Sequence, residues 1–224
     1  MQICLFDIDG TLISSGGAGV AALYNALKSE FGKASADDGV AIHGRTDCAI
    51  TRDLFEVYGI ENSPLNWDRF RAAYLHHLGE LLPQREGGVL PGVLPLLQAL
   101  KHARRVALGL LTGNTRAGAR LKLDHFGLTD YFAFGGFGDV HFARDDVARD
   151  ALHDARRQGV LFGESDRVWV IGDTPLDVAC ARAVGARAVA VATGQFSCAE
   201  LTRAEPDHLV ADFSNYEEAL AWWS

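Results

Sequence analysis

Short apolar runs recur along the chain and alternate with longer stretches of helical periodicity. The runs that indicate buried strands cover residues 3–6, 106–111, 168–171 and 188–191. Uninterrupted runs of this kind are typical of a parallel sheet that is covered on both faces. Helical patterns, each followed by a glycine suited to ending a helix, lie between them over residues 115–126, 145–158 and 175–184. The alternation predicts an α/β fold with a doubly wound parallel sheet.

Residues 15–88 break this rhythm. They show amphipathic helical patterns over residues 18–31, 47–58 and 67–82, but no convincing buried strand appears between Leu12 and Val106. We therefore expect a small helical cap domain over 15–88, inserted after the first strand, and an α/β core formed by 1–14 and 89–224. Two segments, 14–17 and 86–88, connect the predicted core to the predicted cap. Both contain glycines that tolerate large backbone changes, which predicts hinges there.

Composition and charge narrow the class of protein. The 224 residues, 48% hydrophobic and 22% charged, can bury one substantial core or a core with a smaller second domain. A formal charge of −8 disfavours nucleic acid or an anionic membrane as the main partner. No apolar stretch approaches the roughly 20 residues that a bilayer requires, and no basic leader precedes the first strand. We expect a cytoplasmic location.

The cysteines are scattered along the chain. They form no CxxC pair and no zinc-finger spacing with histidine, and their positions are Cys4, Cys48, Cys180 and Cys198. We expect buried, reduced thiols, with neither a disulfide nor zinc.

The sequence FDIDGT places two carboxylates, Asp7 and Asp9, at the end of the first predicted strand. The two-residue period of a strand puts both on one side, and ligands of open α/β sheets bind beyond the carboxyl ends of the strands. Carboxylates gathered there repel each other unless a cation compensates them, and Mg²⁺ prefers carboxylate, phosphate and water oxygens. An aspartate that only caps the next turn is the alternative.

Two later strands end in polar residues at the same predicted edge. The run LGLLTGN ends in Thr112, Gly113 and Asn114 before a helix, where a hydroxyl, free amides and a helix N-terminus can bind an anion. The run VWVIGDTPLD ends in Asp173, with Asp177 four residues later. Each of these residues could be an ordinary cap or a solvated charge. Three strands that are distant in sequence all end in polar residues at one edge, however, and this favours a functional site.

In these motifs and their order the chain resembles the haloacid dehalogenase superfamily, in its phosphatase branch with a Rossmann-like core and a helical cap. FDIDGT, LLTGN and IGDTPLD stand in the places of the first, second and fourth motifs, and the match covers nearly the whole chain. The resemblance implies that Asp7 is the nucleophile that forms an aspartyl-phosphate. It implies that Asp9 protonates the leaving alcohol and then activates water, while Thr112 and Gly113, beside Asn114, hold phosphate oxygens.

The same resemblance implies a Mg²⁺ ion on Asp7, on the backbone carbonyl of Asp9 and on Asp173, with Asp177 steadying these ligands. The second acid of the first motif also separates two reactions. An alkoxide leaving group needs a proton and a halide does not, so Asp9 argues against dehalogenation.

The family's third motif, a lysine or arginine that links the nucleophile to the phosphate, has no obvious match. Arg144, in HFARDDVARDAL, falls where this residue is expected, and we favour it. Its rival is Lys122, in GARLKLDHFGL, although a lysine on an amphipathic helix is more often a solvated surface charge. His141 and Arg149 are weaker candidates.

In the predicted cap, HGRTD over residues 43–47 resembles the turn that helical-cap members close over the substrate. Arg45 could pair with a second anionic group of the substrate, because guanidinium suits carboxylates and phosphates, or it could form a surface salt bridge. The first possibility suggests a small anionic ester, and phosphoglycolate is a familiar substrate among helical-cap relatives.

The predicted function is Mg²⁺-dependent hydrolysis of a phosphate monoester of a small metabolite. The glycine-containing segments match neither GxGxxG nor GxxxxGK, and the chain has no GxSxG or HExxH. A phosphomutase with the same four motifs stays open as an alternative. A non-enzymatic regulator on this fold is less favoured, because it need not retain both pairs of acids.

Overall fold

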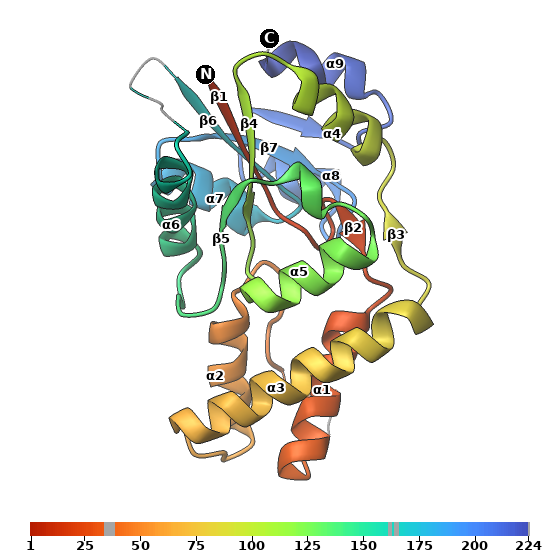
Figure 1. Cartoon of the computed structure of the whole chain (residues 1–224), viewed down its shortest axis with the longest axis vertical. Coiled ribbons are helices and arrows are strands. Elements are labelled where there is room, and N and C mark those ends of the chain that lie inside the picture. Colours follow the sequence, from red (N-terminus) through yellow and green to blue (C-terminus); the bar gives the residue numbers. More distant parts are fainter. Residues whose placement is uncertain (34–38, 161–162, 164–165, 224) are drawn as a thin grey trace.

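We analysed a computed structural model, which describes residues 1–33, 39–160, 163 and 166–223. Within these residues a six-stranded sheet of order β5-β4-β1-β6-β7-β8 forms the centre of the molecule (Figure 1). All of its strand pairs are parallel. Its strands are β1 (Gln2–Phe6), β4 (Val106–Leu111), β5 (Phe134–Gly136), β6 (Arg167–Gly172), β7 (Arg187–Val191) and β8 (His208–Val210). The predicted α/β fold with a parallel sheet is confirmed.

Helices cover both faces of the sheet, which explains why its strands are apolar throughout. Alternate residues of β1 point to opposite faces: Cys4 and Phe6 join one core cluster, and Ile3 and Leu5 join the other. The first cluster is closed by α4 (Val93–His102), α5 (Arg116–His125) and α9 (Tyr216–Leu220), with the short turns η2 (Thr129–Tyr131) and η3 (Ala221–Trp223). The second is closed by α6 (Arg144–Arg157), α7 (Pro175–Ala183) and α8 (Cys198–Thr202).

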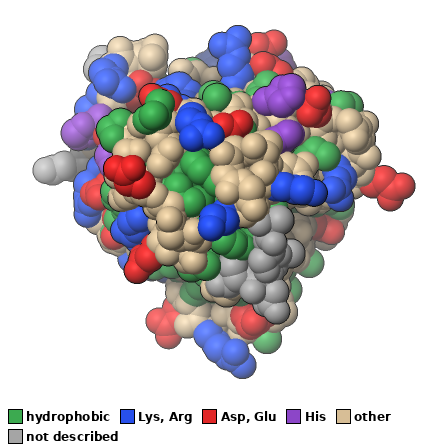
Figure 2. Space-filling model, turned by 90° about the horizontal axis from the view of Figure 1, so that it is seen from below, with side chains coloured by type: hydrophobic (Ala, Val, Ile, Leu, Met, Phe, Trp, Pro, Cys, Tyr) green, Lys and Arg blue, Asp and Glu red, His purple; other side chains and the backbone are tan. Residues whose placement is uncertain are grey.

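A helical unit lies beyond one end of the sheet (Figure 1). It consists of α1 (Ala18–Phe31), α2 (Asp47–Val57), α3 (Pro64–Leu81) and the turn η1 (Leu82–Gln84). These helices share a hydrophobic cluster of their own, which includes Leu27, Leu54, Phe55 and Leu78. Acidic and basic side chains are interspersed over the face that this unit presents in Figure 2. The three expected helices are thus present, while the division of the chain into two domains stays a prediction.

The sequence pattern missed several short elements. The crossings to the helical unit contain β2 (Ile13–Ser14) and β3 (Gly88–Val89), which pair antiparallel where we expected no strand. Strands of two or three residues, including β5 and β8, are too short to show a period. None of the helices in the described ranges is long and apolar enough to cross a membrane.

The prediction of buried thiols was wrong for one cysteine. Cys4, Cys48 and Cys180 are buried, but Cys198 is exposed. It is the first residue of the short helix α8, whose buried side is represented by Leu201 instead. Amphipathic placement on a surface helix therefore overrode the usual tendency of cysteine to be buried.

Candidate active site

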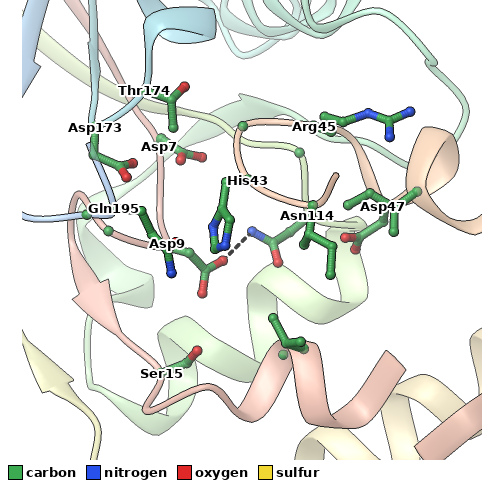
Figure 3. Close-up of a pocket in the computed structure, with 18 of the residues that line it drawn as sticks. Asp7, Asp9, Ser15, His43, Arg45, Asp47, Asn114, Asp173, Thr174 and Gln195 are labelled. Atoms are coloured by element: carbon green, nitrogen blue, oxygen red, sulfur yellow. Dashed lines mark hydrogen bonds between the residues drawn. The ribbon is translucent and has the colours of Figure 1, made fainter. Parts of the chain in front are cut away.

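Asp7, Asp173 and Asp177 meet at the carboxyl edge of the sheet. Asp7 directly follows β1, Asp173 directly follows β6, and Asp177 lies in the first turn of α7. Each offers a carboxylate oxygen within 4.8 Å of the other two, and all three residues are buried. Asp7 and Asp173 lie beside one another at the end of the cavity shown in Figure 3. The acids that follow β1 and β6 therefore lie at one edge of the sheet, as predicted from the sequence.

Negative charge in this cluster is poorly compensated by the protein alone. Burial raises the pKa of Asp7 to about 6, against the opposing effect of Arg144. Burial, together with repulsion from Asp7 and Asp177, raises the pKa of Asp173 to about 8. The raised pKa values mean that the carboxylates repel one another when ionised, and a bound cation would relieve this repulsion. Their oxygen atoms are the ligands that a hard divalent cation such as Mg²⁺ prefers.

Asp177 is fixed in place rather than solvated. It forms a capping box with Thr174, whose hydroxyl donates to Oδ2 of Asp177 over 2.7 Å. Its Oδ1 lies 2.5 Å from Nη2 of Arg144. The alternative of a solvated Asp177 is therefore wrong.

Arg144 is the first residue of α6 and is buried beside the nucleophile candidate. Its Nη2 lies 3.1 Å from Oδ1 of Asp7, and its Nη1 donates to the carbonyl of Gly44 over 3.2 Å. Burial alone would lower the pKa of Arg144, but Asp177 and Asp7 raise it, so the guanidinium stays charged. Arg149, in contrast, pairs with Asp146 at the surface. Arg144 therefore lies where a third-motif residue would act, and its role stays a prediction.

Lys122 is not a solvated surface charge, as its position on an amphipathic helix suggested. Only 4% of its side chain is exposed, and its Nζ lies 2.6 Å from Oδ2 of Asp9. Burial would raise the pKa of Asp9, but the charge and hydrogen bond of Lys122 and the amide of Asn114 lower it. The correction has a packing reason: α5 contacts α3 of the helical unit as well as the core, so Lys122 is buried while Arg120 and Asp124 on the same helix stay exposed.

The second-motif residues divide between the cavity and the layer beneath it. Thr112 is fully buried, and its hydroxyl accepts a hydrogen bond from Nδ2 of Asn114 over 2.7 Å. Gly113 and Asn114 line the cavity. A side chain at Gly113 would collide with the carbonyl oxygen of Arg45, so glycine is required for this close approach.

The loop over residues 43–47 closes directly onto the second motif. The amide of Asp47 donates to the carbonyl of Gly113 over 2.7 Å, and its Oδ2 accepts from the amide of Thr115 over 2.8 Å. Burial raises the pKa of Asp47 to about 6, which places a fourth aspartate, beside Asp7, Asp9 and Asp173, at the cavity. We had not singled out Asp47 from the sequence, although it ends the HGRTD turn.

Arg45 lines the same cavity, but its guanidinium is already engaged. Its Nη2 lies 2.6 Å from Oδ2 of Asp53, and its Nη1 donates to the carbonyl of Ala41. Figure 3 shows the guanidinium pointing away from Asp7 and Asp9. In this arrangement Arg45 forms a salt bridge, and its contact with substrate stays a prediction.

These residues enclose one cavity of about 380 Å³ between the sheet and the helical unit. The family model described as haloacid dehalogenase-like hydrolase matches residues 4–191, which include all of the predicted motifs. The chain belongs to this family.

Similar proteins agree with the family match over almost the whole chain. A phosphoglycolate phosphatase of Synechococcus elongatus is 31% identical, with 98% of this chain and 97% of the relative covered. A phosphoglycolate phosphatase of Rhodospirillum rubrum is 32% identical, with 85% of this chain and 79% of the relative covered. The crystal structure of a hydrolase from Pseudomonas syringae superposes with a TM-score of 0.75 at 23% identity, covering 99% of both chains. This haloacid dehalogenase-like hydrolase thus has the family's fold.

Proposed function

We propose that this haloacid dehalogenase-like phosphatase hydrolyses a phosphate monoester of a small metabolite, with Mg²⁺, through an aspartyl-phosphate on Asp7. The observation that carries the proposal is the buried cluster of Asp7, Asp173 and Asp177 beside the guanidinium of Arg144. A second acid, Asp9, lines the same cavity but pairs with a different cation. Separate environments for two neighbouring acids suit two separate catalytic roles.

The residues divide the work of a two-step transfer. Asp7 attacks phosphorus, and splitting the hydrolysis into two displacements makes each step accessible. Against the effect of burial, Lys122 lowers the pKa of Asp9 in the free enzyme, so Asp9 has to be protonated in the substrate complex to give a proton to the departing alkoxide. It later takes one from the attacking water. Arg144 and the amide of Gly113 stabilise the phosphoryl oxygens. Thr112 lies buried beneath the cavity, where its hydroxyl accepts a hydrogen bond from Asn114, so its contact with phosphate stays a prediction. Mg²⁺ held by Asp7, the backbone carbonyl of Asp9 and Asp173 would neutralise charge during the transfer.

The size of the cavity and the named relatives indicate the substrate. A volume of about 380 Å³ suits a small metabolite ester. Several similar proteins are phosphoglycolate phosphatases, so phosphoglycolate heads the list of esters to be tested. A carboxylate on the substrate would have to take the place of Asp53 on Arg45.

The direct test is a phosphate-release assay. The wild-type protein should hydrolyse p-nitrophenyl phosphate with Mg²⁺, lose this activity in EDTA and regain it when excess Mg²⁺ is added. A panel of phosphorylated metabolites then identifies the preferred ester. Wild-type protein that is inactive on every ester would refute the proposal, and rearrangement of a sugar phosphate without net phosphate release would identify a phosphomutase.

Arg45→Ala tests whether this arginine binds the substrate's second anionic group. We expect KM for phosphoglycolate to rise by about tenfold or more, the effect of one lost charge-assisted hydrogen bond, while KM for p-nitrophenyl phosphate changes little. Arg52→Ala is the matched control, because Arg52 pairs with the same Asp53 and is more exposed. An equal change for both esters would show that Arg45 only shapes the loop.

A further inference from the structure

Lys122 takes part in a closed set of contacts that the roles proposed so far do not use. Its Nζ lies 2.6 Å from Oδ2 of Asp9 and 2.6 Å from Oδ1 of Asn114. Asn114 in turn donates from Nδ2 to the same Oδ2 of Asp9 over 2.8 Å, as the dashed line in Figure 3 shows. Each of the three side chains therefore contacts the other two.

The surroundings of Lys122 indicate a built arrangement rather than a chance surface contact. Its side chain is 4% exposed, whereas that of Asp9 is 38% exposed toward the cavity. Helix α1 passes so close that a Cβ atom on Gly19 would lie 3.3 Å from Nζ of Lys122. A buried ammonium group is costly unless it is paired and hydrogen-bonded, and Asp9 and Asn114 supply both.

The two buried cations of the site pair with different acids. Arg144 contacts Asp7 and Asp177, which leaves Lys122 with Asp9. A partly exposed carboxylate after a strand can adopt several rotamers, and catalysis needs it in one of them. Lys122 and Asn114 both hydrogen-bond to Oδ2 of Asp9, so neither of them contacts Oδ1.

We propose that Lys122 is a positioning residue that, together with Asn114, holds the carboxyl group of Asp9 in place to serve the leaving group. The proposal rests on the function proposed above, in which Asp9 is the acid. It differs from a role of Lys122 in binding the transferred phosphoryl group, and the two roles have different kinetic consequences. A phosphate ligand affects all esters equally, whereas a residue that acts through the acid matters most for leaving groups that need a proton.

The experiment compares kcat/KM for p-nitrophenyl phosphate and phenyl phosphate, two esters of similar shape. p-Nitrophenolate is a far weaker base than phenolate, so its departure needs less help from Asp9. In Lys122→Met we expect the ratio of kcat/KM, p-nitrophenyl over phenyl, to rise at least about tenfold over wild type. Arg120→Met removes an exposed cation from the same helix and should leave the ratio unchanged.

A double-mutant cycle with Asp9→Asn shows whether Lys122 acts through Asp9. Asp9→Asn alone should raise the ratio, and adding Lys122→Met should raise it no further. Lys122→Gln, which keeps a donor without the charge, replaces Lys122→Met if the latter does not fold. If the folded Lys122 variant lost the same factor in kcat/KM for both esters while the wild type was active, this proposal alone would be overturned. A wild type inactive on both esters would overturn the proposed function, and this inference with it.

Discussion

Asp7→Asn is expected to lower kcat for phosphate release by more than about 10⁴-fold, because it removes the nucleophile while keeping the size of the side chain. The variant should fold, since burial raises the pKa of Asp7 to about 6 and so already disfavours its charged form. Phosphate release from p-nitrophenyl phosphate and the melting temperature measure the two effects separately.

Asp68→Asn is the matched control, because Asp68 is an exposed aspartate on α3 that pairs with the neighbouring Arg71. It should behave as wild type. Acid quenching of the wild type during turnover, followed by borohydride reduction, should convert Asp7 to homoserine. Reduction at any other aspartate, or substantial activity in Asp7→Asn, would contradict the assignment of the nucleophile.

The sheet could be predicted from sequence because its strands are buried on both sides. Trp169, Val170 and Ile171 of β6 are all at most 1% exposed, so this part of the strand contains no polar position that would resemble a helix or a loop. Helix ends were predicted within a few residues where glycine follows, as at Gly127 and Gly185. Short edge strands such as β8 carried no comparable signal.

The acids could be predicted because the topology itself places them. Asp7 and Asp173 follow neighbouring parallel strands, β1 and β6, so their carboxylates must emerge at the same edge. The inference for these acids needs only the order of elements, and no knowledge of how side chains pack. Arg144 was placed by the resemblance to the family, from its spacing to the fourth motif.

Side chains whose environment depends on contacts between distant segments could not be predicted. The burial of Lys122 requires α3 and α1 to cover α5, and these helices lie far away in the sequence. The same holds for Asp47, whose carboxylate accepts a hydrogen bond from the distant amide of Thr115. The partner of Arg45 is Asp53, and this pairing depends on the local geometry of α2. Periodicity gives the face of a helix but not what covers it.

Arg144→Met should reduce both stability and activity strongly. The substitution leaves Asp7 and Asp177 buried without their counter-ion, and removal of one partner from a buried ion pair costs about 3–5 kcal/mol. For a chain of this size that corresponds to a decrease of roughly 10 °C in melting temperature. We also expect kcat to fall by about 10²–10³-fold, because a group that stabilises the transferring phosphoryl oxygens is lost. Thermal unfolding and phosphate release measure the two effects.

We expect Arg144→Met to destabilise the protein because it leaves buried negative charge unpaired, and a second substitution tests this cause. Asp177→Asn added to Arg144→Met should destabilise the protein by less than the sum of the two single changes, because the double variant removes both members of the pair. Arg149→Met, on the same helix but at the surface, should leave stability and kcat near wild type, since exposed pairs contribute little. Additive effects of the two buried substitutions would mean that Arg144 stabilises the fold by packing rather than by charge. In the expected case, the electrostatic balance that keeps Asp7 ionised for attack is also what keeps this edge of the sheet folded.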